Sequence, residues 1–167
     1  MKKIRKFVFV LFLLPFIAVS GQDYVTGFEL RNLENQTVTF EDLKGESLTV
    51  VDFWATWCKP CIYSIPKLEE IYLEFADEGV NFIGVSVDSP RNLSKVRPMA
   101  ASLGITYPVV LDPNSETMSN WNILAVPTLL VINEDNEVLY FHEGFKPGDE
   151  ELIRGELNQL LNKTPKQ

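Results

Sequence analysis

The sequence predicts an α/β fold in which a central mixed β-sheet is flanked by helices. Two continuous apolar runs rich in β-branched residues, at positions 48–54 and 80–87, are typical of strands that are buried on both faces of a sheet. A segment with helical periodicity follows each run, and this alternation indicates parallel pairing of the central strands. The chain then closes with two strands joined by a short polar turn and a last amphipathic helix, which makes the sheet mixed.

The first half of the chain is expected to form a β-hairpin, a central strand and a long helix. Pro60 suits the first turn of that helix, where no backbone hydrogen bond is lost. Pro66 falls inside the helix and is expected to kink it, and Gly79 is expected to end it. The expected elements are strands at 27–30 and 36–40 around a turn at 32–35, a turn at 41–45, a strand at 48–54 and a helix from 59 to about 76.

The second half is expected to add three strands and three helices to the second central strand. Ser89 and Pro90 have the pattern of a helix start, a serine cap followed by a first-turn proline. We therefore expect an extra helix after the second central strand, running to about Leu103 and broken near Pro98. The other expected elements are strands at 80–87, 107–111, 128–133 and 137–142, a short helix at 114–121 and a last helix from 148 to 161.

The first twenty residues have the three-part pattern of a secretory signal peptide. A basic segment precedes the apolar run 7–19, and Ala18 and Ser20 supply the small residues of a cleavage site after Ser20. An uncleaved membrane anchor is the alternative, but the run is shorter than the ~20 residues that span a bilayer. No cysteine follows the run, which excludes a bacterial lipoprotein. The expected division is a signal peptide at 1–20, a short linker at 21–26, one domain at 27–161 and a frayed tail at 162–167.

The chain has 167 residues, which suffice for one domain, and a net charge of −8. Removal of the basic N-terminal segment leaves the mature chain with a net charge of −12. This acidic balance argues against nonspecific binding of nucleic acids, whose phosphates attract basic surfaces. The chain has only two cysteines, so it is not a small domain stapled by several disulfides.

Cys58 and Cys61 are the residues that say most about chemistry. They lie where a buried strand gives way to a helix, the position of ligand sites in open α/β sheets. A helix N-terminus stabilises a thiolate and Lys59 adds a positive charge, so Cys58 is expected to attack and the deeper Cys61 to resolve. A permanent disulfide is an alternative, although so short a loop gains little stability from closure. Structural zinc is another, but two thiols and the lone His142 do not complete its ligand set.

The segment 51–61 (VDFWATWCKPC) resembles the active-site segment of the thioredoxin superfamily, and the tripeptide 126–128 (VPT) resembles its proline loop. The signal segment, the N-terminal hairpin and the extra helix resemble the exported TlpA/ResA-like branch. The resemblance covers about residues 27–161 and implies a thioredoxin-like fold for this domain. It also implies a thiol–disulfide oxidoreductase that uses no metal and no organic cofactor.

The resemblance further implies how the surroundings of the cysteines act. Pro127 is expected to be cis and to face the cysteines, while the backbone of Val126 pairs with the substrate chain. Trp57 is expected to be a partly exposed wall of this docking surface, and Lys59 and Pro60 between the cysteines to contact substrate as well. Packing against the core is the alternative for Trp57. Trp54 and Trp121 are expected to be core residues.

Asp52 is an acid in the middle of an apolar strand, where a carboxylate is rarely buried without a reason. Thioredoxin has an aspartate at the matching position that assists proton transfer, so the resemblance implies a catalytic Asp52, with quiet hydrogen bonding as the alternative. Desolvation is expected to raise the pKa of Asp52. The sequence departs from its relatives at two positions near this acid and the cysteines. The strand at 80–87 lacks the lysine that faces this acid in thioredoxin, and Ser64 replaces a glutamate of some ResA-like reductases.

Four functions remain in competition at this point. The favoured one is a reductase of exported proteins, with apocytochrome c among the candidate substrates, and its close alternative is a disulfide-forming oxidant or isomerase. A peroxidase is less favoured because Thr56 is present but the upstream proline that such enzymes need is absent. A non-catalytic binding module is disfavoured because both cysteines are present. The expected partners are exported thiol or disulfide proteins and a membrane electron donor or acceptor, for a monomer in the periplasm or cell envelope.

Overall fold

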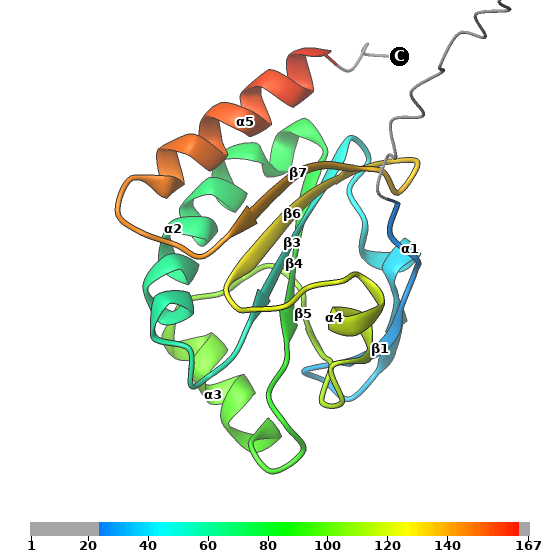
Figure 1. Ribbon diagram of the computed structural model, residues 1–167, viewed down its shortest axis with the longest axis vertical. Coiled ribbons are helices and arrows are strands. Elements are labelled where there is room, and N and C mark those ends of the chain that lie inside the picture. The colour runs from blue at the N-terminus through cyan, green and yellow to red at the C-terminus, as the bar shows by residue number, and fades with distance from the viewer. Residues whose placement is uncertain (1–23, 164–167) are drawn as a thin grey trace, which may run out of the picture.

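The computed structural model describes residues 24–163 of the chain (Figure 1). The signal segment expected at 1–20 lies outside the described residues. The strands are β1 (Glu29–Asn32), β2 (Thr37–Thr39), β3 (Leu48–Trp54), β4 (Val80–Ser86), β5 (Val109–Leu111), β6 (Thr128–Asn133) and β7 (Val138–Glu143). The helices are α1 (Phe40–Leu43), α2 (Lys59–Phe75), α3 (Leu93–Ser102), α4 (Glu116–Asn120) and α5 (Asp149–Lys163), with a 3₁₀ turn at Ala76–Glu78.

The strands form one mixed sheet in the order β2-β1-β5-β4-β3-β6-β7. β3, β4 and β5 are parallel neighbours, whereas β6 pairs with β3 in the antiparallel sense and β7 with β6. The hairpin of β1 and β2 adds to the other edge through an antiparallel pair with β5. β3 is thus an inner strand between β4 and β6, and all seven of its residues are buried.

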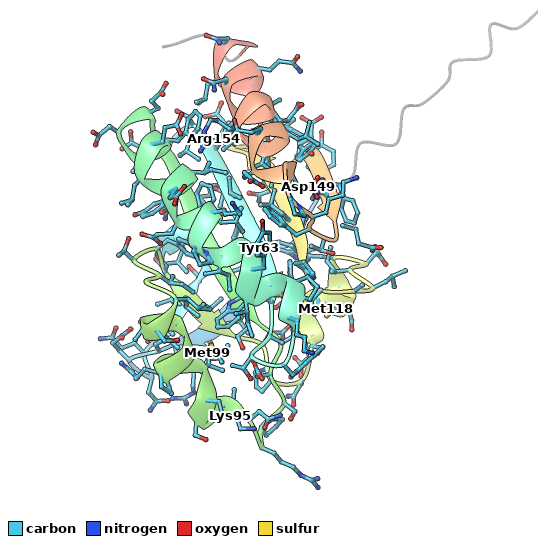
Figure 2. The ribbon with its side chains drawn as sticks, turned by 90° about the vertical axis from the view of Figure 1, so that its left-hand side faces the viewer. Tyr63, Lys95, Met99, Met118, Asp149 and Arg154 are labelled. Atoms are coloured by element: carbon cyan, nitrogen blue, oxygen red, sulfur yellow. A yellow bond between two sulfur atoms is a disulfide. The ribbon has the colours of Figure 1, made fainter. Side chains whose placement is uncertain are left out.

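Helices cover both faces of the sheet, with α2 and α5 on one side and α1 and α4 on the other (Figure 1). Figure 2 shows α2 and α5 side by side in front of the sheet. Leu48 and Val50 of β3 belong to the apolar cluster beneath these two helices. Phe53 faces the opposite side, where it packs against Trp121 with ring centroids 5.7 Å apart. The alternation of side chains along β3 therefore contributes to both halves of the core.

Most of the predicted elements are confirmed. The strands at 48–54 and 128–133 have the predicted bounds, and the N-terminal hairpin and both closing strands are present within two residues of their predicted limits. α2 begins at Lys59 with Pro60 in its first turn, and it runs without a break through Pro66. Gly79 ends the following turn with φ +80°, a conformation that favours glycine.

Two local predictions are wrong. The turn expected at 41–45 is the short helix α1, because Thr39 and Asp42 form a reciprocal capping box. The helix expected from Ser89 begins instead at Leu93. The residues before it form a turn in which the Asn92 amide donates to the Ser89 carbonyl, and α3 then continues through Pro98.

The domain begins earlier than predicted. Tyr24 pairs with Glu137, and the amide of the buried Val25 donates to the Asn136 carbonyl at 2.9 Å. The indole N–H of Trp121 donates to the Thr26 carbonyl at 2.8 Å. Residues 24–26, expected to be part of a linker, therefore belong to the domain. At the other end α5 reaches Lys163, two residues beyond the predicted limit of the domain. Within 24–163, no helix combines the length and the apolar composition required to cross a bilayer.

Candidate functional site

The two cysteines lie at the junction of β3 and α2 and are joined by a disulfide with an S–S distance of 2.00 Å. Cys58 is the N-cap residue of α2, and its Sγ accepts a hydrogen bond from the Cys61 amide at 3.2 Å. The first amides of a helix lack partners within the helix, and the dipole of this 17-residue helix points its positive end at Cys58. The reduced Cys58 sulfur therefore occupies a place that stabilises its thiolate.

The surface around the cysteines carries both an exposed aromatic ring and an exposed basic side chain. Trp57 is 61% exposed, and Lys59 and Pro60 are exposed too. Cys61 is fully buried, as expected from its deeper position. Cys58 is more exposed than the deeper Cys61, although in this disulfide its exposed fraction is only 4%. The largely exposed indole of Trp57 thus directly precedes the nearly buried Cys58 in the chain.

The proline loop lies next to the strand end that carries the cysteines. Phe53 is paired with Thr128, so the preceding residues Val126 and Pro127 run alongside the end of β3. The Val126–Pro127 peptide bond is cis, as predicted. Val126 is half-buried against the cluster that contains both cysteines. Nearby Leu124 is 88% exposed, an apolar contact surface that the sequence analysis did not identify.

Asp52 occupies the middle of β3, on the face that α2 covers, and is only 1% exposed. Burial raises the pKa of its carboxyl to about 7, which confirms the prediction from the sequence. Its partners in the neighbouring strands are Gly84 and Leu129, so neither strand places a cation opposite the acid. A carboxyl of this kind exchanges its proton near neutral pH, which suits a general acid or base.

A second buried carboxylate, Asp88, holds the loop that leads into the cysteines. Asp88 has no solvent exposure and accepts three hydrogen bonds, two of them from Thr56, whose amide lies 2.8 Å and whose hydroxyl 2.6 Å from its oxygens. Ser86 donates the third at 3.0 Å. The contact joins the end of β4 to the residue two positions before Cys58. The sequence analysis did not identify Asp88, because Asp88 and Thr56 are 32 residues apart in the chain. The one feature of the sequence that could have indicated it is the position of an acid just after a buried strand.

Loss of the Thr56 hydroxyl should weaken the fold at this loop. We expect Thr56→Val to lower the free energy of unfolding by about 1.5–3 kcal/mol, since it removes a hydrogen bond to a buried charge. Urea denaturation of the oxidised protein measures this effect. Thr37→Val, at an exposed position of β2, is the matched control and should change stability by less than about 0.5 kcal/mol. Equal stability of the two variants would mean that the Thr56–Asp88 contact does not support the loop.

The described side chains that could act as metal ligands are not clustered. Within residues 24–163 no group of three or more His, Cys, Asp or Glu side chains is placed to hold an ion. His142 lies instead on β7, where its Nε2 is 3.0 Å from the Asp149 carboxylate. Figure 2 labels Asp149 at the start of α5. His142 is therefore occupied away from the cysteines.

Comparison with known proteins places this geometry in a family. The profile described as the AhpC/TSA family matches residues 22–141, most of the folded domain. The chain belongs to this family. Thiol-disulfide oxidoreductase ResA of Halalkalibacterium halodurans is 30% identical over 128 residues, which cover 77% of this chain and 70% of that protein. The chain is a ResA-like thiol–disulfide oxidoreductase.

Solved structures agree with this assignment. A protein from Chlorobium tepidum, provisionally assigned as thiol:disulfide interchange protein DsbE, is 26% identical with a TM-score of 0.76 over 84% of this chain and 96% of that one. An uncharacterised thioredoxin-like protein from Porphyromonas gingivalis is 29% identical with a TM-score of 0.71, over 85% of this chain and 94% of that one. The fold of this family member is thus the thioredoxin-like fold that the sequence predicts.

Proposed function

We propose that the protein reduces disulfides in exported proteins, using Cys58 as the nucleophile and Cys61 as the resolving thiol. The observation that carries this proposal is the position of the disulfide. Cys58 caps α2 and accepts the Cys61 amide, whereas Cys61 lies one turn deeper and fully buried. The same geometry that stabilises a Cys58 thiolate keeps Cys61 out of contact with substrate.

The two thiols carry both electrons of the exchange. The Cys58 thiolate attacks one sulfur of the substrate disulfide and releases the other as a thiolate, leaving a mixed disulfide. Cys61 then loses its proton and attacks the Cys58 sulfur, which releases the second substrate thiol and closes the Cys58–Cys61 disulfide. Two electrons pass to the substrate, and a membrane electron donor must return two electrons to the protein before the next cycle.

Asp52 is the group we assign to the proton of Cys61. Its carboxyl is buried on the face of β3 that α2 covers, and its pKa of about 7 lets it accept a proton and give it back at neutral pH. No other acid of β3 is available, because Asp52 is the only charged residue of that strand. In this role Asp52 acts on the resolving step rather than on the first attack.

The docking surface consists of the exposed Trp57, the dipeptide Lys59–Pro60 and the proline loop at Val126 and Pro127. Trp57 offers an apolar wall, and the loop runs beside the strand end next to the cysteines. A half-buried Val126 beside this strand end supports pairing of its backbone with an extended substrate segment. Exposed apolar residues near a buried sulfur favour a protein substrate over a small thiol.

The redox potential decides between a reductase and an oxidant. Equilibration of the protein with glutathione or dithiothreitol buffers of known potential measures the ratio of dithiol to disulfide. A potential near that of thioredoxin, about −270 mV, supports a reductase. A potential near that of DsbA, about −120 mV, would assign the protein to disulfide formation instead.

Export is the expected localisation, with the signal segment removed near Ser20. The basic start, the apolar run at 7–19 and the small residues at Ala18 and Ser20 motivate this proposal. N-terminal sequencing of the protein purified from its host should find a mature chain that begins near residue 21. A chain that still begins at Met1 or Lys2 would mean that the segment is retained as an anchor.

Apocytochrome c is one candidate among the exported substrates of the proposed reductase.

A further inference from the structure

Three buried side-chain atoms in the described part of the chain have no hydrogen-bond partner: Asp52 Oδ2, Trp54 Nε1 and Tyr107 Oη. Buried polar atoms are nearly always paired, so each exception asks for an explanation. The three are complementary, because the indole N–H and the phenol O–H are donors and the carboxylate oxygen is an acceptor.

The three side chains lie on one face of the sheet. Asp52 and Trp54 are two residues apart on β3 and therefore point to the same side. Gly84 of β4 is the residue paired with Asp52. A Cβ on Gly84 would lie 3.2 Å from Trp54 Nε1 and 3.2 Å from Tyr107 Cε2. The absence of a side chain at Gly84 is therefore what lets the indole N–H and the Tyr107 ring come together beside Asp52.

The charges around Tyr107 keep its hydroxyl a donor. Burial raises the pKa of Tyr107 well above its usual value, and the negative charges of Asp52 and then Glu69 raise it further. The phenol is therefore neutral throughout the pH range in which Asp52 titrates. Of the two carboxylates, Asp52 raises the pKa of Tyr107 more than Glu69 does. Asp52 is therefore close enough to the Tyr107 ring to interact with it electrostatically.

Other groups facing this site are already engaged or carry no charge. Glu69 of α2 is buried, and it accepts hydrogen bonds from the amide and the hydroxyl of Thr106. The strand neighbours of Asp52 are Gly84 and Leu129. In the first turns of α2 the Cys61 sulfur is held in the disulfide, and the buried Ser64 hydroxyl donates to the Cys61 carbonyl. Tyr107 and Trp54 are the donors left to serve the acid.

We propose that Tyr107 and Trp54 donate hydrogen bonds to one enclosed water that in turn donates to Asp52, so that Tyr107 is a positioning residue for this buried acid. A water in a polar interior site makes about three such bonds, which matches the two donors and one acceptor present. The bond stabilises the charged carboxylate and gives its proton a defined exchange partner. The kinetic part of this inference rests on the proposed role of Asp52 in the resolving step.

The variant that tests the inference is Tyr107→Phe, which removes the hydroxyl and retains the ring. The pKa of Asp52 is read from the carboxyl ¹³C shift of ¹³C-aspartate-labelled protein in the disulfide form, where neither cysteine titrates. We expect the pKa of Asp52 to rise by about one pH unit, since the enclosed water loses the hydroxyl that orients it and then stabilises the charged carboxylate less. The pH profile of disulfide exchange in the same variant should move to higher pH by the same amount.

Tyr72→Phe is the matched control. Tyr72 of α2 touches the Tyr107 ring at a centroid distance of 5.6 Å and contacts Phe82, so it tests the loss of a neighbouring tyrosine hydroxyl in the same aromatic cluster. It should leave the pKa of Asp52 unchanged. An Asp52 pKa that is unchanged or lowered in Tyr107→Phe would overturn the inference. A raised pKa with an unmoved exchange profile would support the contact with Tyr107 and overturn instead the acid–base role of Asp52.

Discussion

Cys61→Ser is expected to accumulate a mixed disulfide on Cys58, whereas Cys58→Ser is expected to form no adduct and to lose exchange activity to the background level. Cys58 caps α2 and its sulfur accepts the amide of residue 61, so its thiolate is the stabilised one. Cys61 is fully buried one turn deeper, with its sulfur bonded to that of Cys58. Without Cys61 the first attack proceeds and the intermediate has no resolving thiol.

Non-reducing gels of each variant, expressed in the exporting compartment, measure the adducts. Trp57→Ala in the Cys61→Ser background is a useful companion, because it removes an exposed wall of the docking surface and leaves the cysteine in place. The double variant is expected to form fewer adducts than Cys61→Ser alone. Equal adducts in the two single-cysteine variants, or adducts only with Cys58→Ser, would reverse the assignment of roles. Mass spectrometry of the trapped adducts identifies the substrates.

The sequence was sufficient for the central part of the fold and for the position of the cysteines. The strand at 48–54 is predictable because all seven residues are buried and only Thr49 and Asp52 among them are polar. Burial raises the pKa of the second of these residues, Asp52, to about 7. The cis bond at Pro127 was predictable only through the family resemblance, because a proline before an apolar strand is trans in most proteins.

The elements that were missed depend on contacts between distant residues or on local caps. Helix α1 exists because Thr39 and Asp42 cap it, a four-residue signal too short to stand out within a loop. The contact of Asp88 with Thr56 and the approach of Tyr107 to Asp52 arise only when β4 and β5 are placed beside β3. Periodicity within one segment carries no information about such neighbours. Sequence reasoning therefore located the reactive sulfurs and left out most of the residues that hold them in place.

Asp52→Asn should stabilise the protein at alkaline pH and slow disulfide exchange. The pKa of Asp52 is about 7 in the folded protein and near 3.8 when exposed, so between these values the folded state binds the extra proton. Stability from this group is complete below about pH 4 and is lost as the pH rises through 7. The loss amounts to as much as about 4 kcal/mol above pH 8, from 1.36 kcal/mol per pH unit. Asparagine does not ionise, so the variant retains that stability.

Urea denaturation between pH 4 and pH 9 measures the effect on stability. The variant and the unchanged protein should nearly coincide at pH 4, diverge between pH 4 and about pH 7, and differ by a constant amount above about pH 8. The matched control is Asp112→Asn, at a buried carboxylate that accepts the amides of Glu116 and Met118. It should lower stability, because those hydrogen bonds to a charge weaken. Parallel pH curves for Asp52→Asn and the unchanged protein would show that the carboxyl is not desolvated.

The same variant separates stability from catalysis. Exchange by Asp52→Asn should be slower by about two orders of magnitude at neutral pH, the lower end of what a positioned acid or base contributes. The inflection near pH 7 in the rate of the resolving step should disappear with it, since that inflection belongs to the carboxyl. A protein that is more stable yet exchanges disulfides more slowly is the signature of a buried acid retained for proton transfer. A variant that gains stability and exchanges at the original rate, with its inflection intact, would leave Asp52 without a catalytic role.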